Sequence, residues 1–316
     1  MTAEPKMIII TPAFEDAEAF SQLLAALAEA FSNAVFVIAV DDGSIRKPLM
    51  MSAFEESGVA GEIIKLRRNV GHQQAIAVGL AHATEQYKDD HRVVIMDSDG
   101  EDMPASIPDL LRLLDDPETD AVVAQRKARV ETIRFKVFYQ IYKLIFRILT
   151  GKSINFGNFM ALKPHAVKRL AAMQEVNLHV PGALIASRLR IGASPQDRGG
   201  RYAGKSKMNF VSLVLHGFKG LMVFAENVFV RVGIACALMA TLSVFGGIAA
   251  ISLKIMGFST PGWFSIALGI LLLIFMQTAA FALITFMVAG IIRSKSAAPQ
   301  NAHHALIDEI IRSKGA

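Results

Sequence analysis

The sequence contains very little cysteine and tryptophan: among 316 residues there is one of each, Cys236 and Trp263. A single cysteine excludes an intramolecular disulfide and a zinc site built from several cysteines. The sequence also lacks a Walker phosphate loop, a Gly-x-Gly-x-x-Gly turn, and a Ser-His-Asp or Cys-His arrangement for nucleophilic catalysis. It has no arginine-rich tract and a net charge of only +5, so nucleic acid is not an expected partner.

Charged residues are missing from two long stretches, 232–253 and 255–292. Each exceeds the ~20 residues that cross the hydrocarbon core of a bilayer. We therefore predict a two-helix transmembrane hairpin over 231–292, followed by a short polar tail over 293–316 that is helical if it is ordered. The start of the chain shows no signal-peptide pattern. Both termini are expected in the cytoplasm, because positive residues follow the second span: Arg293, Lys295, Arg312 and Lys314.

The N-terminal half alternates short apolar runs with helical patterns. Such alternation is typical of an α/β protein with a mostly parallel sheet that is covered on both faces. In these sheets ligands bind beyond the carboxyl ends of the strands, which is where Asp42 and Asp97 fall. The predicted strands are 7–11, 35–40, 63–66, 92–96 and 121–124.

Two amphipathic stretches separate this half from the predicted hairpin. Residues 129–152 interleave aromatic and basic side chains, which is typical of a helix that lies in a membrane interface. The alternative is a helix packed on the sheet with its lysines extending to water. Residues 206–230 are predicted to form a second membrane-interface helix.

A run of apolar residues, 93–96, leads directly into the carboxylates Asp97, Asp99, Glu101 and Asp102. Unpaired carboxylates are costly to bury, so we expect the strand to end in a cleft where a divalent cation offsets their charge. Oxygen ligands with no nearby His or Cys favour Mg²⁺ or Mn²⁺. We predict that Asp97, Asp99 and Glu101 bind this ion, and Asp102 receives no role. The alternative is a solvated surface turn.

Asp42 ends another predicted strand and can accept hydrogen bonds from a base or a ribose, although an Asp-Gly turn explains the sequence equally well. Residues 11–15, which include Pro12 and Glu15, offer a further wall of the same crevice. His72 is either a general base or a structural residue at a helix start.

Basic residues supply the positive counterpart of these carboxylates. The segment 198–207 is rich in glycine and cationic, and such a segment can hold phosphate oxygens. Contact with anionic lipid headgroups is the alternative. The candidate phosphate-binding residues are Arg126, Arg198, Arg201, Lys205 and Lys207.

Taken in order, the segments TPAFED, VDDGS, LRRNVGHQQAIAVGL, VIMDSDGED, AQR and RYAGKSKM, followed by two spans, resemble the family 2 glycosyltransferases. More narrowly, they resemble the enzymes that use polyisoprenyl phosphates, such as dolichol-phosphate mannose synthase and the undecaprenyl-phosphate glycosyltransferases. The resemblance implies a GT-A domain over residues 1–205. It also implies transfer of a sugar, with inversion, from a UDP- or GDP-sugar to an undecaprenyl or dolichyl phosphate.

The resemblance also assigns roles to individual residues. It puts Pro12, Glu15, Asp42 and Asp97 at the nucleotide sugar, and Asp97, Asp99 and Glu101 at Mg²⁺ or Mn²⁺. It makes Asp99, Arg126, Arg201 and Lys205 the catalytic and phosphate-binding groups. An inner-membrane location with a cytoplasmic active site is implied as well, and a homo-oligomer is left open. The family usually has Asp-Ala-Asp-Leu-Gln where this chain has Asp-Ser-Asp-Gly-Glu, so Glu101 and Gly100 are departures.

The lack of an evident catalytic base fits this implied acceptor. A sugar hydroxyl must lose a proton as it attacks, whereas a lipid phosphate is already an anion and needs positive groups and a metal instead. Two alternatives stay open at this point. One is a synthase resembling the processive polysaccharide synthases, and the other is a membrane-anchored nucleotide-sugar-binding subunit without turnover.

Overall fold

The computed structural model describes residues 7–31, 34–87, 91–126, 133–203, 210–258, 262–294 and 303–313. The chain divides into two compact units. We call them the sheet unit, drawn from residues 1–138, 154–223 and 298–316, and the hairpin unit, drawn from residues 139–153 and 224–297. Each unit is described by itself.

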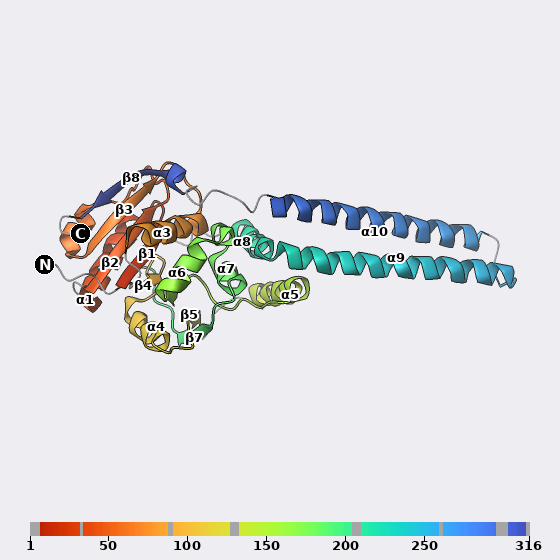
Figure 1. The fold of residues 1–316 in the computed structure, drawn as a ribbon, viewed down its shortest axis with the longest axis horizontal. Coiled ribbons are helices and arrows are strands. Elements are labelled where there is room, and N and C mark those ends of the chain that lie inside the picture. The colour runs from red at the N-terminus through yellow and green to blue at the C-terminus, as the bar shows by residue number, and fades with distance from the viewer. Residues whose placement is uncertain are drawn as a thin grey trace. The chain divides into compact units, whose positions relative to one another are not determined.

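Within the described residues, the sheet unit is built on one mixed sheet in which eight strands are ordered β7-β5-β6-β4-β1-β2-β3-β8. Figure 1 shows β8 beside β3 at one edge of this sheet. Neighbouring strands are parallel, except that β6 runs antiparallel to β4 and β5, and β8 runs antiparallel to β3. The strands are β1 (Met7–Ala13), β2 (Val35–Asp41), β3 (Ala60–Leu66), β4 (Arg92–Ile95), β5 (Ala121–Arg126), β6 (Met160–Leu162), β7 (Ile191–Gln196) and β8 (Ile307–Arg312).

Helices cover both faces of this sheet, as predicted. Successive strand residues point to opposite faces, so Ile8 and Ile10 of β1 enter one apolar core and Ile9 enters the other. The first core packs under α3 (His72–Gln86), α6 (Pro164–Ala171) and α7 (Val180–Ala186), which lie together on one side of the sheet in Figure 1. The second core packs under α1 (Ala17–Phe31), α2 (Ser52–Ser57) and α4 (Ile107–Leu114).

All five predicted strands are present, and the structure adds three that the sequence analysis did not predict. β6 has only three residues, and β7 reads IGASPQ, so neither carries a clear apolar pattern. β8 lies in the segment that was expected to be a short polar tail, helical if ordered. It pairs instead with β3 at the edge of the sheet.

A buried charged network anchors β8. The carboxylate of Glu62 in β3 is fully buried and contacts His82 Nε2 at 2.6 Å and Arg312 Nε at 3.0 Å. Burial acts to raise the pKa of Glu62, but contacts with His82, Tyr87 and Arg312 outweigh it and hold that pKa below its usual value. Arg312 therefore pairs with a carboxylate of the sheet, although it was counted among the positive residues of the tail.

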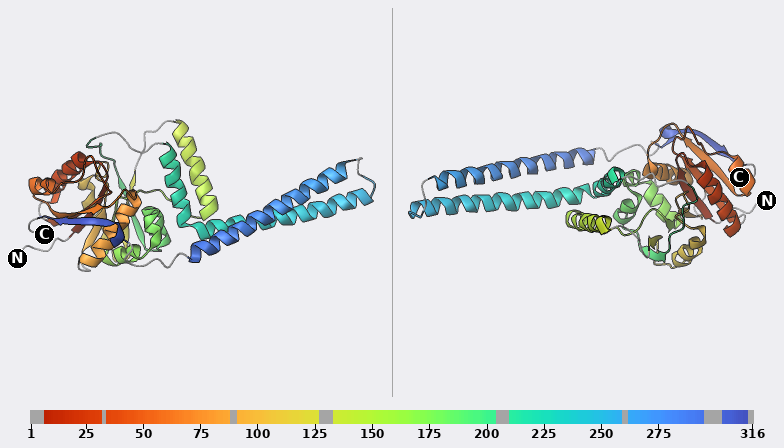
Figure 2. Two further views of the ribbon diagram at one scale, coloured as in Figure 1. Left: turned by 90° about the horizontal axis from the view of Figure 1, so that it is seen from above. Right: turned by 180° about the vertical axis from the view of Figure 1, so that it is seen from behind.

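In the hairpin unit, two long helices run side by side, α9 (Ala225–Ile255) and α10 (Trp263–Ser294) (Figure 2). The most apolar window of α9 is only 11% buried, and that of α10 is 0% buried. Helices of the core of a soluble protein would be mostly buried, so these two helices are long, apolar and exposed enough to cross a membrane. The unit also contains most of α5 (Ile133–Thr150), in which Phe146 packs edge-on against Phe224 at 5.9 Å.

Candidate active site

The carboxylate loop, which we define as residues 97–102, follows β4 at the carboxyl edge of the sheet. Because β1, β2 and β4 are parallel, this edge also carries the ends of β1 and β2. The backbone N–H of Asp97 donates to Asp102 Oδ2 at 2.9 Å, and the N–H of Glu101 donates to Asp99 Oδ1 at 3.0 Å. Asp102, which had no predicted role, thus closes the loop.

An arginine loop, residues 198–202, lies on the carboxylate loop. Its backbone is joined to the carboxylate loop at both ends, since Gly199 N–H donates to the carbonyl of Glu101 at 3.0 Å and Tyr202 N–H donates to that of Asp99 at 2.8 Å. Arg201 Nη2 lies 2.8 Å from Asp99 Oδ2, and Arg201 Nε lies 2.9 Å from Glu101 Oε1. Two segments about 100 residues apart in sequence are therefore one structure.

Glu101 contacts both guanidinium groups of the arginine loop. One of its oxygens contacts Arg201, and the other contacts Arg198. Among the described side chains, Arg198 and Arg201 thus pair with Asp99 and Glu101, and Asp97 lies on the side of His72. The departure from the family pattern at Glu101 coincides with the position that both arginines contact.

The pKa values reflect this crowding. Burial, together with the charge of Asp97, raises the pKa of Asp99, although Arg201 and Arg198 oppose the rise. Burial lowers the pKa of Arg198, against the attraction of Asp99. A cation between Asp97 and Asp99 would relieve the repulsion that raises the pKa of Asp99. The oxygen atoms of Asp97 and Asp99 suit a hard divalent ion such as Mg²⁺ or Mn²⁺. The expectation that no histidine lies nearby was wrong, because His72 Nε2 lies 3.1 Å from Asp97 Oδ1.

His72, at the start of α3, joins the site from a third direction. Its Nε2 lies 3.1 Å from Asp97 Oδ1 and 2.9 Å from Asn158 Nδ2. Desolvation lowers the pKa of His72, but the carboxylates around it outweigh this effect and raise the pKa. Asn158 Oδ1 in turn accepts from Gln73 Nε2 at 3.1 Å. The sequence analysis missed Gln73 and Asn158, since isolated amides carry no sequence signal.

Asp42 and Glu15 follow the ends of β2 and β1 at the same edge of the sheet, and backbone N–H groups occupy their oxygens. Asp42 accepts from Val70 N–H at 2.7 Å and from Gly71 N–H at 2.9 Å, so it fixes the entry to α3. Burial raises the pKa of Asp42, although these hydrogen bonds oppose it. Glu15, at a φ of 50°, accepts from three consecutive N–H groups of residues 45–47, and these bonds lower its pKa. Both carboxylates therefore hold loops at this edge of the sheet.

The remaining predicted residues are placed less fully. Pro12 lies in β1 beside Val40, and its carbonyl accepts from Ser98 Oγ at 3.3 Å. Arg126 ends β5 in register with Gln196, but the structure describes only its backbone. Lys205 and Lys207 lie outside the described residues.

Comparison with known proteins identifies the family of this chain. A family model described as glycosyl transferase family 2 matches residues 8–175, which include the carboxylate loop. The chain belongs to glycosyltransferase family 2. It is therefore a glycosyltransferase, and its sheet unit has the GT-A fold.

Two similar sequences are those of bacterial glycosyltransferases. An uncharacterized glycosyltransferase of Bacillus subtilis, YkoT, is 25% identical over 282 residues, which are 85% of this chain and 82% of YkoT. An Enterobacter undecaprenyl-phosphate 4-deoxy-4-formamido-L-arabinose transferase is 25% identical over 216 residues, which are 66% of this chain and 64% of that enzyme. This glycosyltransferase thus spans somewhat less than two thirds of the Enterobacter enzyme.

A similar solved structure is glucosyl-3-phosphoglycerate synthase from Mycobacterium tuberculosis, determined with Mn²⁺, UDP-glucose and phosphoglyceric acid. The TM-score is 0.51 at 18% identity, and the match covers 72% of this chain and 81% of that one. At this identity the likeness establishes the shared fold.

Proposed function

We propose that this glycosyltransferase moves a sugar from a nucleoside-diphosphate sugar to the phosphate of a polyisoprenyl lipid, with inversion and with a divalent metal. The observation that carries the proposal is the union of the carboxylate loop with the arginine loop. Such a site can hold a metal-bound diphosphate on one side and an anionic acceptor on the other. The name of the Enterobacter relative supports a polyprenyl-phosphate acceptor.

The metal would be held by Asp97 and Asp99, with Glu101 as a third candidate ligand. When bound, Mg²⁺ or Mn²⁺ supplies positive charge to the leaving diphosphate. In the structure Arg198 contacts Glu101, and Arg201 contacts Asp99 and Glu101. We propose that they turn to phosphate oxygens when the donor and the acceptor bind, because guanidinium groups pair with phosphate as well as with carboxylate.

No general base is required by this proposal. The acceptor is a phosphate anion, so His72 has only to position Asp97 through its 3.1 Å contact. Asp42 and Glu15 contribute by holding the loops that form the wall of the nucleotide site, and direct contacts from Pro12 and Asp42 to the nucleotide remain part of the proposal. Arg126 and Lys205 are proposed to bind phosphate.

The hairpin unit supports a lipid acceptor. α5 exposes apolar side chains at the helical spacing i, i+3, i+4 and i+7, and each is 46–59% exposed: Ile141, Leu144, Ile145 and Ile148. An exposed apolar face on this helix favours the interface position over the alternative of packing on the sheet.

The course of the chain bears on topology. The chain leaves the sheet unit after α8 (Phe210–Val223), passes through α9 and α10, and returns to the sheet unit in β8. If both helices cross the bilayer, the two ends of the hairpin therefore lie on one side of the membrane. We propose that this is the cytoplasmic side of an inner membrane, where nucleotide sugars are made.

The test is sugar transfer from radiolabelled UDP- and GDP-sugars to undecaprenyl phosphate in detergent, with Mn²⁺ or Mg²⁺ and with a chelator. We expect a lipid-linked product that the chelator abolishes. Asp99→Asn should remove turnover while expression and membrane insertion persist. Asp109→Asn, which changes an exposed carboxylate on α4, is the matched control. A failure to form lipid-linked product with any donor would refute the proposal.

The same assay separates the alternatives. Product that grows beyond one sugar would indicate a polysaccharide synthase. Donor binding without transfer would indicate a binding subunit.

A further inference from the structure

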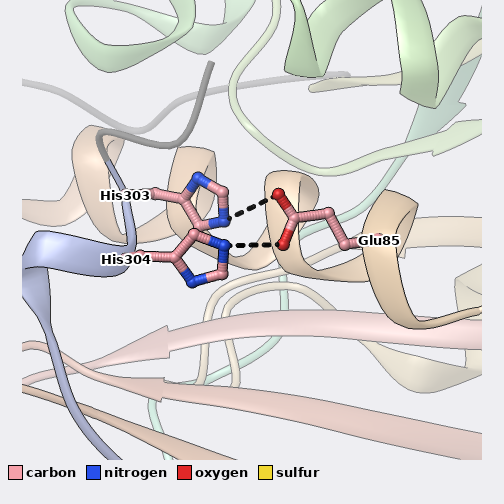
Figure 3. Close-up of side chains that lie close together, drawn as sticks. All are labelled: Glu85, His303 and His304. Carbon is pink, nitrogen blue, oxygen red and sulfur yellow. Dashed lines mark ion pairs between the residues drawn. The ribbon is translucent and has the colours of Figure 1, made fainter. Parts of the chain in front are cut away.

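A second group of metal-binding side chains lies far from the carboxylate loop. Glu85 is in the last turn of α3, thirteen residues after His72, which is about 20 Å along the helix axis. His303 and His304 come from the other end of the sequence, just before β8. Figure 3 shows both imidazoles turned toward the Glu85 carboxylate.

The geometry brings three donor atoms together. His303 Nε2 lies 3.2 Å from Glu85 Oε1, and His304 Nε2 lies 3.1 Å from Glu85 Oε2. When one ligand atom is taken from each of the three residues, these atoms all lie within 4.8 Å of one another. Tetrahedral zinc with bonds near 2.05 Å needs ligand separations of about 3.4 Å, and the two nitrogen–oxygen distances are already close to that value.

Burial singles out His303. Its side chain is 9% exposed, and its Nε2 is a buried polar atom that makes no aligned hydrogen bond within the described part of the chain, although Glu85 lies within 3.2 Å. A buried nitrogen without an aligned partner carries a desolvation cost. A metal ion held between it and the carboxylate would remove that cost.

The pairing of the two rings points the same way. The imidazole centroids of His303 and His304 are 4.2 Å apart. Both imidazoles can therefore reach a single divalent ion, each binding through nitrogen in the neutral form.

The backbone around the group is fixed on both sides. Leu306 N–H donates to the carbonyl of His303 at 3.0 Å, and the carbonyl of Leu306 accepts from Arg67 N–H at 2.9 Å beside β3. Glu85 is held by the helix. The donor atoms are therefore carried by elements that are already in place, which lowers the entropy cost of binding an ion.

We propose that Glu85, His303 and His304 form a site for Zn²⁺ or a similar transition-metal ion, with water completing the coordination. Two imidazole nitrogens and one carboxylate suit Zn²⁺ and disfavour the hard ions Mg²⁺ and Ca²⁺. The bound ion joins α3 to the segment that returns from the hairpin and enters β8, so it stabilises the edge of the sheet. This site is independent of the sugar-transfer proposal.

The experiment measures Zn²⁺ bound to the full-length protein, purified in detergent without a polyhistidine tag and stripped of metal by a chelator. Equilibrium dialysis against Zn²⁺ in excess Mg²⁺, followed by elemental analysis, keeps the hard oxygen site occupied by Mg²⁺. We expect one bound Zn²⁺ per chain. We also expect slower amide hydrogen exchange across residues 307–312 when Zn²⁺ is present.

His304→Ala and Glu85→Gln should each weaken Zn²⁺ binding by at least about tenfold, because losing a ligand must cost no less than losing a supporting contact. His304 is 53% exposed, and Glu85→Gln preserves the size of the side chain, so both variants should fold. His165→Ala, which removes an exposed histidine that contacts Asp120 at 3.1 Å, is the control and should bind Zn²⁺ normally. Absence of Zn²⁺ binding by the unchanged protein, or unchanged affinity in both variants, would overturn the proposal.

Discussion

Replacing Arg312 by alanine tests whether β8 is an integral part of the sheet unit. Arg312 contacts the fully buried Glu62 carboxylate at 3.0 Å, and removal of the guanidinium leaves that carboxylate its contact with His82 at 2.6 Å. Removing one partner of a buried ion pair costs about 3–5 kcal/mol. Arg312 is itself 51% exposed and His82 remains, so we expect a loss of about 2 kcal/mol, near the low end for a hydrogen bond to a charged group.

The matched control lies on the same strand. Glu309 pairs with Lys65 at 3.2 Å, but their side chains are 57% and 33% exposed, and such surface pairs contribute less than about 1 kcal/mol. For a unit of this size, the Arg312→Ala loss corresponds to a Tm lower by about 4–8 °C, and Glu309→Ala should change the Tm by half of that or less. Circular dichroism melting and hydrogen exchange at residues 60–66 and 307–312 measure both.

The effect has a defined pH dependence. The folded pKa of Glu62 is depressed, so the contribution of its ion pairs is present above the unfolded pKa of about 4.3 and is lost as the pH falls through the folded value. The difference between Arg312→Ala and the unchanged protein should therefore shrink on acidification. Equal Tm values for Arg312→Ala and Glu309→Ala at neutral pH would refute the reasoning.

Three further predictions concern the sheet unit. His179 Nδ1 accepts the Gly182 N–H at the start of α7, and burial lowers the pKa of His179 to about 3. The neutral ring therefore contributes stability above the unfolded pKa of about 6.5, and this stability is lost as the pH falls toward 3. His179→Asn should thus flatten the decrease in Tm between about pH 6.5 and 5. Gly100 has a φ of 90°, and an added Cβ would lie 2.7 Å from the Tyr202 ring, so Gly100→Ala should cost about 1–3 kcal/mol from backbone strain plus the ring displacement. Asp120 accepts from Arg190 Nε at 3.0 Å and Nη2 at 2.7 Å, so Asp120→Asn should lower stability by about 1.5–3 kcal/mol in denaturant titration.

Each of these predictions has an outcome that contradicts it. If the Tm of His179→Asn decreases with falling pH as steeply as that of the unchanged protein, a group other than His179 causes the decrease. Gly100→Ala should cost less in a Tyr202→Ala background, and an equal cost there would exclude the ring contact. Glu118→Gln changes an 83% exposed partner of Arg190 and should alter the stability little. A loss of stability as large as that of Asp120→Asn would contradict the view that the buried position of Asp120 makes its contacts with Arg190 important.

The sequence predicted much of the fold because local patterns report burial directly. The apolar runs that became β1 to β5, the amphipathic helices and the two uncharged stretches each carry their signal within a few neighbouring residues. The carboxylates of the loop after β4 could be found for the same reason, since charge directly after a buried strand is unusual wherever the strand lies. The family resemblance, which rests on several such segments in order, is confirmed by the family match to residues 8–175.

Tertiary structure alone decided how distant segments meet. The pairing of Glu101 with Arg198 and Arg201, the support of His72 by Asn158, and the meeting of Glu85 with His303 depend on contacts that no local pattern encodes. β8 is the clearest case. Its residues, IDEIIR, resemble an ordinary polar tail, and they form a strand because β3 offers an unpaired edge and Glu62 needs a cation. Hydrogen bonding at a sheet edge and the cost of an unpaired buried charge, which act across some 250 residues of chain, determined that part of the fold.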